Sequence, residues 1–478
     1  MKSYETVIGL EVHVQLNTQS KAFCNDPVQF GAEPNTLVSP ISLAHPGTLP
    51  KINKEQVNKA IQLGLALDAS ISLRTDFDRK NYFYPDLPKG YQITQDHQPI
   101  CIGGSLMIRM KDQWKRIRIH HIHMEEDAGK SMHDQEDDYS LVDLNRAGTP
   151  LLEIVTEPDL RSADEVDAFM SGIRQLVRYL DISDGNMQEG SLRCDCNVSI
   201  RPLGSTELNA RCEIKNLNSM RFARQAVAYE VQRQTELVEN GLEVEQQTLT
   251  FDPVSRKTSP IRSKEDAIDY RYFPDPDLPP LKISPVQIEK IQKSQVTLPW
   301  EYHQTFQDWG LSFDDATILS EEMEIAAHFS KLAEGYNHPV LMANCYIQKI
   351  RPWLAEQNIE LKNFPISKPH FWEFLDLIQD NKISNTSGFE KLLPALLNNP
   401  NKKPGELAKE MDLFQKGDAD FLENLIREIL NENPDKVKAY KNGKKGLKGF
   451  FMGELMKKSK GKANPQTSAN LLEKMLDA

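Results

Sequence analysis

Three segments that lie far apart in the sequence alternate apolar residues with carboxylates, imidazoles and amides. In residues 6–16, apolar side chains occupy every second position, and Glu11 and His13 fall between them. Because successive side chains of a strand point to opposite faces of a sheet, these two polar side chains share one face while the apolar row packs into a core. Residues 192–201 repeat the pattern and put Asp195 on the polar face. The sequence therefore predicts a sheet with one buried face and one face rich in ligand groups.

The third segment, residues 115–130, begins as a strand and then carries several histidines and acids. An extended backbone puts His123 and Glu125 on one face and Glu126 on the other. A solvated acidic turn explains this segment taken alone, since more acids follow within residues 134–138. Burying several like charges is costly unless a cation lies among them, and three strands share the pattern. Oxygen and imidazole ligands without thiolates favour a hard divalent ion such as Mg²⁺, usually partnered with phosphates.

The length of 478 residues is too great for one core, so two or three domains are expected. Strands and helices interleave up to the proline-dense residues 274–280, and the pattern beyond them is almost wholly helical. We predict an α+β chain: a mixed α/β domain over residues 1–290, a helical linker domain over 291–370 and a helical tail domain over 371–478. Candidate helices begin near Pro285, Asp314, Val340, Lys368, Ser387, Pro404, Asp418, Pro434 and Asn464.

Composition and cysteine usage exclude several protein classes. No apolar run approaches the roughly 20 residues that a membrane span needs, and residues 1–5 lead into a strand without a signal-peptide core. We therefore expect a cytosolic protein that does not contact membranes. The six cysteines form no Cys-x-x-Cys pair, which argues against a disulfide framework and a four-thiolate zinc site.

The charge distribution points to a local site for a polyanion. A net charge of −12 disfavours broad nucleic-acid binding. Residues 436–462 nevertheless hold ten lysines against one acid, with aromatic residues interleaved. Such a segment fits contact with a phosphate backbone, and a solvated, lysine-rich pair of helices explains it equally well.

Residues 76–93 combine Arg79 and Lys80 with three consecutive aromatic residues, 82–84. Rings that stack and cations that meet phosphate would clamp a nucleotide or a terminal ribose, while an aromatic-rich core loop is the simpler alternative. No glycine-rich phosphate motif stands in a strand–turn–helix context. The residues therefore indicate an ATP-using domain of a fold other than the P-loop, joined to a helical tail.

Seven segments together resemble one known family across essentially the whole chain. They are residues 6–13, 77–86, 123–130, 190–195, 215–219, 269–277 and 460–465. They resemble the B subunits of the bacterial tRNA-dependent amidotransferases, the GatB/GatE family. The resemblance implies an N-terminal cradle domain related to glutamine synthetase and guanidino kinases, and a YqeY-like helical tail that binds tRNA.

The resemblance also implies an activity. The protein would use ATP to phosphorylate the side-chain carboxylate of Glu or Asp on misacylated Glu-tRNA(Gln) or Asp-tRNA(Asn). Ammonia released from glutamine by a partner would then give Gln-tRNA(Gln) or Asn-tRNA(Asn), which makes the enzyme a carbon–nitrogen ligase with glutamine as amide donor. The expected partners are the amidase (A) and small (C) subunits of a heterotrimer, because the chain has no serine–lysine amidase signature and no glutaminase cysteine motif.

Individual positions carry the implied roles. The Mg²⁺ ligands are expected to be Glu11, His13, Glu125 and Asp195, with Glu126 as the alternative to its neighbour Glu125. Lys80 and Glu126 would lie on the ammonia route or at its exit, where Glu126 could take a proton from ammonium. The expected ATP-contacting residues are Arg79, Tyr82, Lys130, Arg193, Lys215 and Asn216.

One departure from the family pattern concerns zinc. Many members carry Cys-x-Cys followed by Cys-x-x-Cys after the first strand, whereas the corresponding positions here are Cys24, Asp26, Ser39 and Ser42. One thiol of four remains, so we expect no zinc. Two other functions stay open: a noncatalytic tRNA-binding adaptor with a merely structural acidic cluster, and a free-standing ATP-dependent ligase for a small acid.

Overall fold

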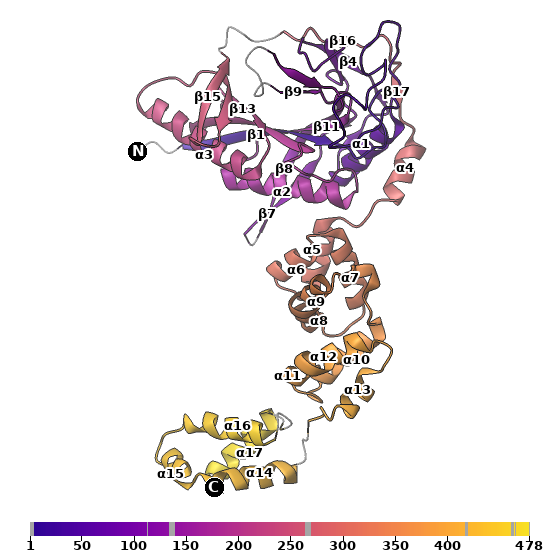
Figure 1. Cartoon of the computed structure of the whole chain (residues 1–478). Helices are drawn as coiled ribbons and strands as arrows, with labels where there is room; N and C mark the ends of the chain where they lie inside the picture. The colour runs from indigo at the N-terminus through magenta and orange to yellow at the C-terminus, as the bar shows by residue number, and fades with distance from the viewer. Residues whose placement is uncertain are drawn as a thin grey trace. The chain divides into compact units, whose positions relative to one another are not determined.

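The computed structural model describes residues 4–111, 113–132, 139–262, 269–415, 419–459, 463 and 465–477. It divides into two compact units, residues 1–303 with 320–323, and residues 304–319 with 324–478. The first unit contains the sheets and the second is helical (Figure 1). This arrangement confirms the predicted α+β class. The finer division at residues 290 and 370 stays a prediction.

The first unit is built on a ten-stranded sheet with the order β15-β14-β13-β12-β1-β11-β8-β6-β2, in which β7 also pairs with β8. Among the described pairs of this sheet only β13 and β14 run parallel. The strands are β1 (Tyr4–Gln15), β2 (Ser70–Ile71), β6 (Cys101–Ile102), β7 (Ser105–Met110), β8 (Gln113–Glu126), β11 (Pro150–Thr156), β12 (Leu192–Pro202), β13 (Cys212–Leu217), β14 (Gln247–Asp252) and β15 (Lys257–Arg262).

One face of this sheet is the hydrophobic core. The predicted apolar rows of β1 and β12 are buried on this face, as the alternation of the two strands requires. The helices α1 (Lys54–Ala66), α2 (Ala163–Tyr179) and α3 (Met220–Glu239) contribute side chains to the same core. In Figure 1, α2 and α3 lie on one side of the sheet.

The other face is covered by small sheets from residues outside the main one. Strand β4 (Asp78–Asn81) pairs with β5 (Tyr91–Thr94) and β16 (Phe273–Pro274), and β9 (Lys130–Met132) pairs with β10 (Leu141–Asp143). A further pair joins β3 (Arg74–Thr75) to β17 (Leu281–Lys282). Figure 1 shows β4, β9 and β16 on the side opposite α2. The polar face of the main sheet is therefore partly covered, and Glu11, His13 and Glu213 on it are half-buried.

Helix α1 is capped by Asn53, and the side chain of Gln56 in its first turn contacts the main sheet. Asn53 caps the helix by accepting hydrogen bonds from the amides of Glu55 and Gln56 at 2.8 and 3.2 Å. A full capping box would turn the Gln56 side chain back to the Asn53 amide. Instead its Nε2 donates to the carbonyl oxygens of Glu125 and Leu151 at 2.9 and 3.3 Å. Gln56 thus ties together the two strands that carry Glu125 and Glu153.

From residue 285 onward, most helices begin at or near a predicted start. The predicted starts at Asp418 and Asn464 lie outside the described residues. No predicted start corresponds to α5, α7 or α16, and in α16 the apolar residues are spread around the helix rather than gathered on one face. The bounds are α4 (Pro285–Lys293), α5 (Pro299–Asp308), α6 (Phe313–Leu319), α7 (Met323–Ala333), α8 (Pro339–Cys345), a π-helix (Tyr346–Ile350), α9 (Arg351–Glu356), a 3-10 turn (Leu361–Asn363), α10 (Lys368–Gln379), α11 (Asn385–Ser387), a π-helix (Gly388–Leu392), α12 (Leu393–Asn398), α13 (Pro404–Glu410), α14 (Ala419–Glu432), α15 (Pro434–Lys441), α16 (Leu447–Lys458) and α17 (Pro465–Asp477).

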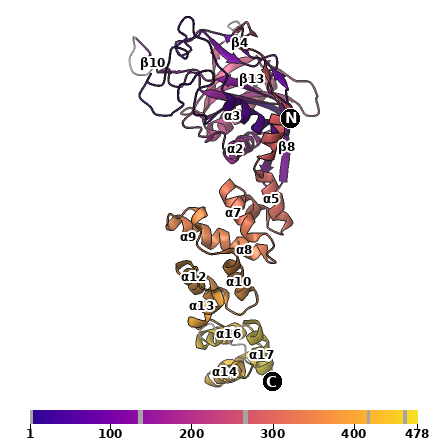
Figure 2. The same cartoon turned by 90° about the vertical axis from the view of Figure 1, so that its right-hand side faces the viewer.

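The last four helices have a small core of their own. Its buried members include Ile426, Phe451 and Leu472 from α14, α16 and α17. Figure 2 shows these three helices grouped at the C-terminal end. Among the described residues, no helix combines the length and apolarity that crossing a bilayer requires.

Candidate functional site

The register of the strands brings the predicted ligands onto the polar face but divides them between two clusters, with His13 and Glu125 in one and Glu11 and Asp195 in the other. In β1, Glu11 lies opposite Asp195 of β12, and His13 lies opposite Glu153 of β11. Glu153 in turn lies opposite His123 of β8. Residues separated by well over 100 positions in the chain thus become neighbours across adjacent strands.

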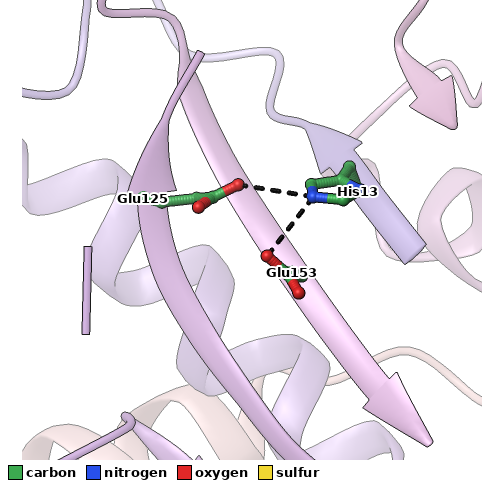
Figure 3. Close-up of side chains that lie close together, drawn as sticks. All are labelled: His13, Glu125 and Glu153. Atoms are coloured by element: carbon green, nitrogen blue, oxygen red, sulfur yellow. Dashed lines mark ion pairs between the residues drawn. The ribbon is translucent and has the colours of Figure 1, made fainter. Parts of the chain in front are cut away.

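The first cluster consists of His13, Glu125 and Glu153, and Figure 3 shows the three side chains turned toward one another. The Nε2 atom of His13 lies 3.3 Å from Glu153 Oε2 and 3.7 Å from Glu125 Oε1. His123 approaches the same two carboxylates from the other side, with its Nε2 atom 3.3 Å from Glu153 Oε2 and 3.7 Å from Glu125 Oε2. Glu153 therefore lies between two imidazoles.

This arrangement shifts the pKa values of the groups in and around the first cluster. Burial lowers the pKa of both histidines, but the charges and hydrogen bonds of Glu153 and Glu125 outweigh it. The net result raises the pKa of His13 to about 9 and that of His123 to about 10. Burial also opposes ionisation of Glu153, yet the two imidazoles hold its pKa well below the usual range. Without a metal, four imidazolium–carboxylate contacts, two from each histidine, hold these groups together.

We expect these contacts to make stability depend on pH when divalent metal is removed. A histidine with a raised pKa in the folded state contributes fully below its unfolded pKa of about 6.5, and the contribution disappears as pH rises through 9 to 10. In EDTA, the free energy of unfolding from urea titrations should fall by several kcal/mol between pH 6.5 and 10, since each pH unit by which a folded-state pKa exceeds the unfolded value is worth about 1.4 kcal/mol. His13→Asn should flatten that decline, and an equally steep decline in the variant would contradict the assignment.

The second cluster consists of Glu11, Asp195 and Glu213, the last from β13. Lys215 Nζ lies 3.3 Å from Asp195 Oδ2 and 2.7 Å from Glu213 Oε1. The amide of Asn216, a residue with a φ of 59°, donates to Asp195 Oδ1 at 2.8 Å. Burial, followed by the charges of neighbouring carboxylates, raises the pKa of Glu11. Glu11 and His13 are two residues apart in β1, or roughly 7 Å, so the two clusters are neighbours.

The donor sets of both clusters suit Mg²⁺. They offer carboxylate oxygens and one imidazole, which are hard ligands, and no thiolate. In the second cluster three carboxylates face one lysine, so negative charge is in excess. A divalent cation would offset that excess.

The structure separates the adjacent residues Glu125 and Glu126. Glu126 points to the other side of β8, where its Oε1 atom accepts a hydrogen bond from the Ile93 amide at 3.0 Å and contacts the ammonium of Lys89. It borders a cavity of about 190 Å³ whose lining also includes Lys21 and Lys89. Glu125 alone of the two reaches the first cluster.

Lys80 lies on the same side of β8 as the first cluster. Its Nζ atom lies 5.0 Å from the centre of the Tyr270 ring. Burial lowers the pKa of Lys80, but Glu125, Tyr272 and Glu153 raise it overall. Lys80 and Glu126, which sequence reasoning put on one route, therefore lie on different sides of β8.

The residues expected to contact ATP fall into two groups. Arg193 donates from Nη2 to Asp127 at 2.9 Å, and its Nε is buried without a hydrogen-bond partner among the described residues. Lys215 and Asn216 adjoin the second cluster, and Tyr82 lies near Glu125, whose charge adds to burial in raising the tyrosine pKa.

Arg79 and Lys130 lie elsewhere. Arg79 donates to Asp275 and Asp277, both at 2.7 Å, and its guanidinium stacks over Tyr91. These ion pairs fasten the β4–β16 edge. Lys130 lies on β9 with an exposed side chain.

The four positions at which the resemblance implies zinc ligands in related proteins lie together but do not suit zinc. Ser42 Oγ donates to Asp26 Oδ2 at 2.5 Å and accepts from the Ser39 amide at 2.9 Å. Burial raises the pKa of Cys24 to about 11, which keeps it a neutral thiol. Zinc sites use thiolate, imidazole or carboxylate ligands, and hydroxyls are poor substitutes.

Sequence reasoning missed Glu153 and Glu213. Glu153 is an acid in the middle of an otherwise apolar buried strand, and this break in the pattern was a usable signal. Glu213 alternates with Lys215 along β13, a pattern that resembles an ordinary solvated edge. Only the strand register reveals their neighbours.

Comparisons with known proteins find similar sequences along almost the whole chain. A family model described as "GatB/GatE catalytic domain" matches residues 6–289, and one described as "GatB domain" matches residues 327–476. The B subunit of the aspartyl/glutamyl-tRNA(Asn/Gln) amidotransferase from Persephonella marina is 43% identical over 478 residues, covering 99% of each chain. A protein of the same name from Pseudomonas paraeruginosa is 46% identical over 481 residues, covering 99% of this chain and 100% of its own.

Proposed function

This chain belongs to the GatB/GatE family of amidotransferase B subunits, and we propose that it activates and amidates misacylated tRNA. The substrate is Glu-tRNA(Gln), Asp-tRNA(Asn) or both, and the reaction is that of a glutamine-dependent carbon–nitrogen ligase. The convergence of the two acidic clusters with Arg193 and Lys215 on one partly covered face supports this proposal most directly.

The chemistry explains why a kinase step is needed. A carboxylate resists ammonia because its leaving group would be oxide, whereas an acyl phosphate releases phosphate. The γ-phosphoryl group of ATP is transferred to the side-chain carboxylate and ADP leaves. Ammonia then attacks the carbonyl carbon, phosphate departs, and a base takes the surplus proton.

The residues that perform the first step lie at the clusters. His13, Glu125 and Glu153, with Glu11, Asp195 and Glu213, would hold Mg²⁺, which supplies charge stabilisation at the phosphoryl oxygens. Arg193, with an unused N–H, and Lys215 are positioned to bind phosphate oxygens. Tyr82 would pack against the nucleotide or the terminal ribose. The contacts made by Arg79 favour a structural role for it, and Lys130 stays a predicted ATP contact.

The second step requires ammonia to reach the opposite side of the same strand. The cavity beside Glu126 is a candidate entrance, and Glu126 would take the proton from ammonium there. Lys80, on the cluster side, would lie where ammonia emerges. Both residues were predicted on the ammonia route or at its exit, and we propose Glu126 at the entrance and Lys80 at the exit.

Contact with tRNA is supported by the C-terminal helices. Lys445, Lys448 and Lys458 form ion pairs with acids of α14 and α17. Lys438, Lys441, Lys444 and Lys457 form no ion pair among the described residues, which leaves them available for phosphate. Lys460 and Lys462 lie outside the described residues.

We also propose that the chain acts together with two partner subunits and binds no zinc. The chain would act in the cytoplasm, in a heterotrimer whose amidase (A) subunit makes ammonia and whose small (C) subunit completes the assembly. The hydroxyl-for-thiol exchange around Cys24 supports the expectation of no zinc.

The test is an assay of the purified chain with ATP, Mg²⁺ and misacylated tRNA. We expect amide formation from ammonium, weaker than in the complete enzyme, and none from glutamine. Adding the two partner proteins should restore activity with glutamine. A noncatalytic adaptor would bind tRNA without amide formation or ATP hydrolysis, and a free-standing ligase for a small acid would amidate free glutamate or aspartate.

A further inference from the structure

A second cavity, of about 590 Å³, lies in the first unit between the C-terminal half of α2, the loop over residues 183–191 and the start of α3. Its ten lining residues include three arginines, Arg174, Arg178 and Arg221, and a single acid, Asp184. In a chain with a net charge of −12, such a local excess of positive charge indicates an anionic ligand.

The three guanidinium groups are largely available. Arg178 and Arg221 are exposed and form no ion pair among the described residues. The Nε atom of Arg174 donates to the carbonyl oxygen of Gly185 at 3.2 Å, and this bond orients the guanidinium group. Its two terminal nitrogens make no hydrogen bond among the described residues and can bind a ligand. Asp184 accepts a hydrogen bond from the Asn186 amide at 3.0 Å within its own loop. The acid therefore shapes the loop and forms no ion pair with the arginines among the described residues.

The start of α3 adds to the positive potential. Its first turn contains no acidic residue, its N-cap Ser219 makes no side-chain capping hydrogen bond, and Arg221 stands in that turn. A cation at a helix N-terminus opposes the macrodipole, so this placement is unfavourable unless an anion binds there.

The lining distinguishes among anions. It contains no aromatic side chain that could stack on a base, and its apolar members are Met187 and Met220. Guanidinium groups match phosphate oxygens, and backbone phosphates carry most protein–nucleic acid hydrogen bonds. The metal that accompanies the triphosphate of ATP needs carboxylate ligands, and this lining contains only one carboxylate, Asp184. The cavity is therefore suited to a phosphate of a nucleic-acid backbone.

The position of the cavity relates it to the reaction. Asn218 lines it, and two residues earlier the amide of Asn216 donates to Asp195 of the second cluster. Two residues span at most about 7 Å, so the rim begins close to that cluster. We propose that this cavity binds a backbone phosphate of the tRNA substrate near its aminoacylated end, an inference that rests on the proposed function.

The experiment compares the full-length chain with the variant Arg178→Gln/Arg221→Gln, titrating a tRNA transcript at 50–300 mM salt. The variant should bind about tenfold more weakly, and the slope of log Kd against log salt should decrease by about 0.7–0.9 per lost phosphate contact. Arg178→Lys/Arg221→Lys keeps the charge and should retain most of the slope. Arg211→Gln is the matched control, because this exposed arginine precedes β13 while the cavity follows it.

The outcomes separate the two proposals. If the unaltered chain binds tRNA and the glutamine variant binds equally well, the cavity assignment fails while the proposed function stands. If the unaltered chain binds no tRNA, both fail. A loss of ATP affinity with unchanged tRNA affinity would identify the cavity as a nucleotide site and overturn the assignment. Unchanged ATP affinity with weakened tRNA binding supports it.

Discussion

Glu153→Gln should lower the rate of ATP-dependent amide formation at least about 100-fold, since even groups that only support metal ligands cost 10–100-fold when changed. The substitution keeps the size of the side chain but removes the charge between His13 and His123. It also removes one of three candidate ligands of the first cluster. The measurement is kcat for amide formation with ammonium at saturating ATP and Mg²⁺.

Two controls make the Glu153 result specific. Glu207→Gln removes a charge from an exposed loop of the same unit and should leave kcat within twofold. The Kd of Glu153→Gln for tRNA should stay within about twofold of the unaltered chain, because the tail helices are untouched. A folded Glu153→Gln protein, judged by its thermal unfolding, that amidates at the normal rate would show that the cluster is not catalytic.

Glu126→Gln should uncouple ATP use from amide formation. The side chain lies across β8 from the first cluster, so phosphoryl transfer keeps its machinery while the proton acceptor for ammonium is lost. We expect amide formation to fall about 100-fold, a loss typical of a missing general base. ATP consumption stimulated by misacylated tRNA should stay within a few-fold.

The neighbouring residue supplies the matched comparison. Glu125→Gln removes a member of the first cluster and should abolish both activities together. The measurement is the ratio of ADP to amide produced, which should rise steeply for Glu126→Gln alone. If both variants lost ATP hydrolysis to the same extent, the separation of roles across the strand would be refuted.

The alternation of residues predicted which side chains face which way. In β1 and β12 the apolar rows are buried, and Glu11, His13 and Asp195 share the polar face as expected. A period of two is a local property, so the sequence carries it directly. The choice between Glu125 and Glu126 also follows this rule, because β8 continues unbroken to Glu126.

The identity of each ligand's neighbours could not be predicted from alternation. Glu153 joins His13 because β11 pairs with β1 in one register, and a shift of one residue would turn it into the core. Register between distant strands depends on how whole strands pack rather than on any short motif. The contact of Gln56 with β8 and β11 could not be predicted for the same reason. A capping box would instead direct its side chain to the Asn53 amide.

The central place of β1 has a consequence for biosynthesis. This strand is synthesised before both strands that it pairs with: its Glu11 meets Asn197 across a separation of 186 residues, and Leu10 meets Thr156 across 146. Contacts between residues so far apart in the chain slow folding, because the entropy of closing the loop is lost before the strands pair and stabilise the structure. The nascent segment must wait, with its apolar row unpaired, until β11 and then β12 have been translated. Chaperones that shield exposed β-strands should therefore engage the N-terminal end of this chain during its synthesis.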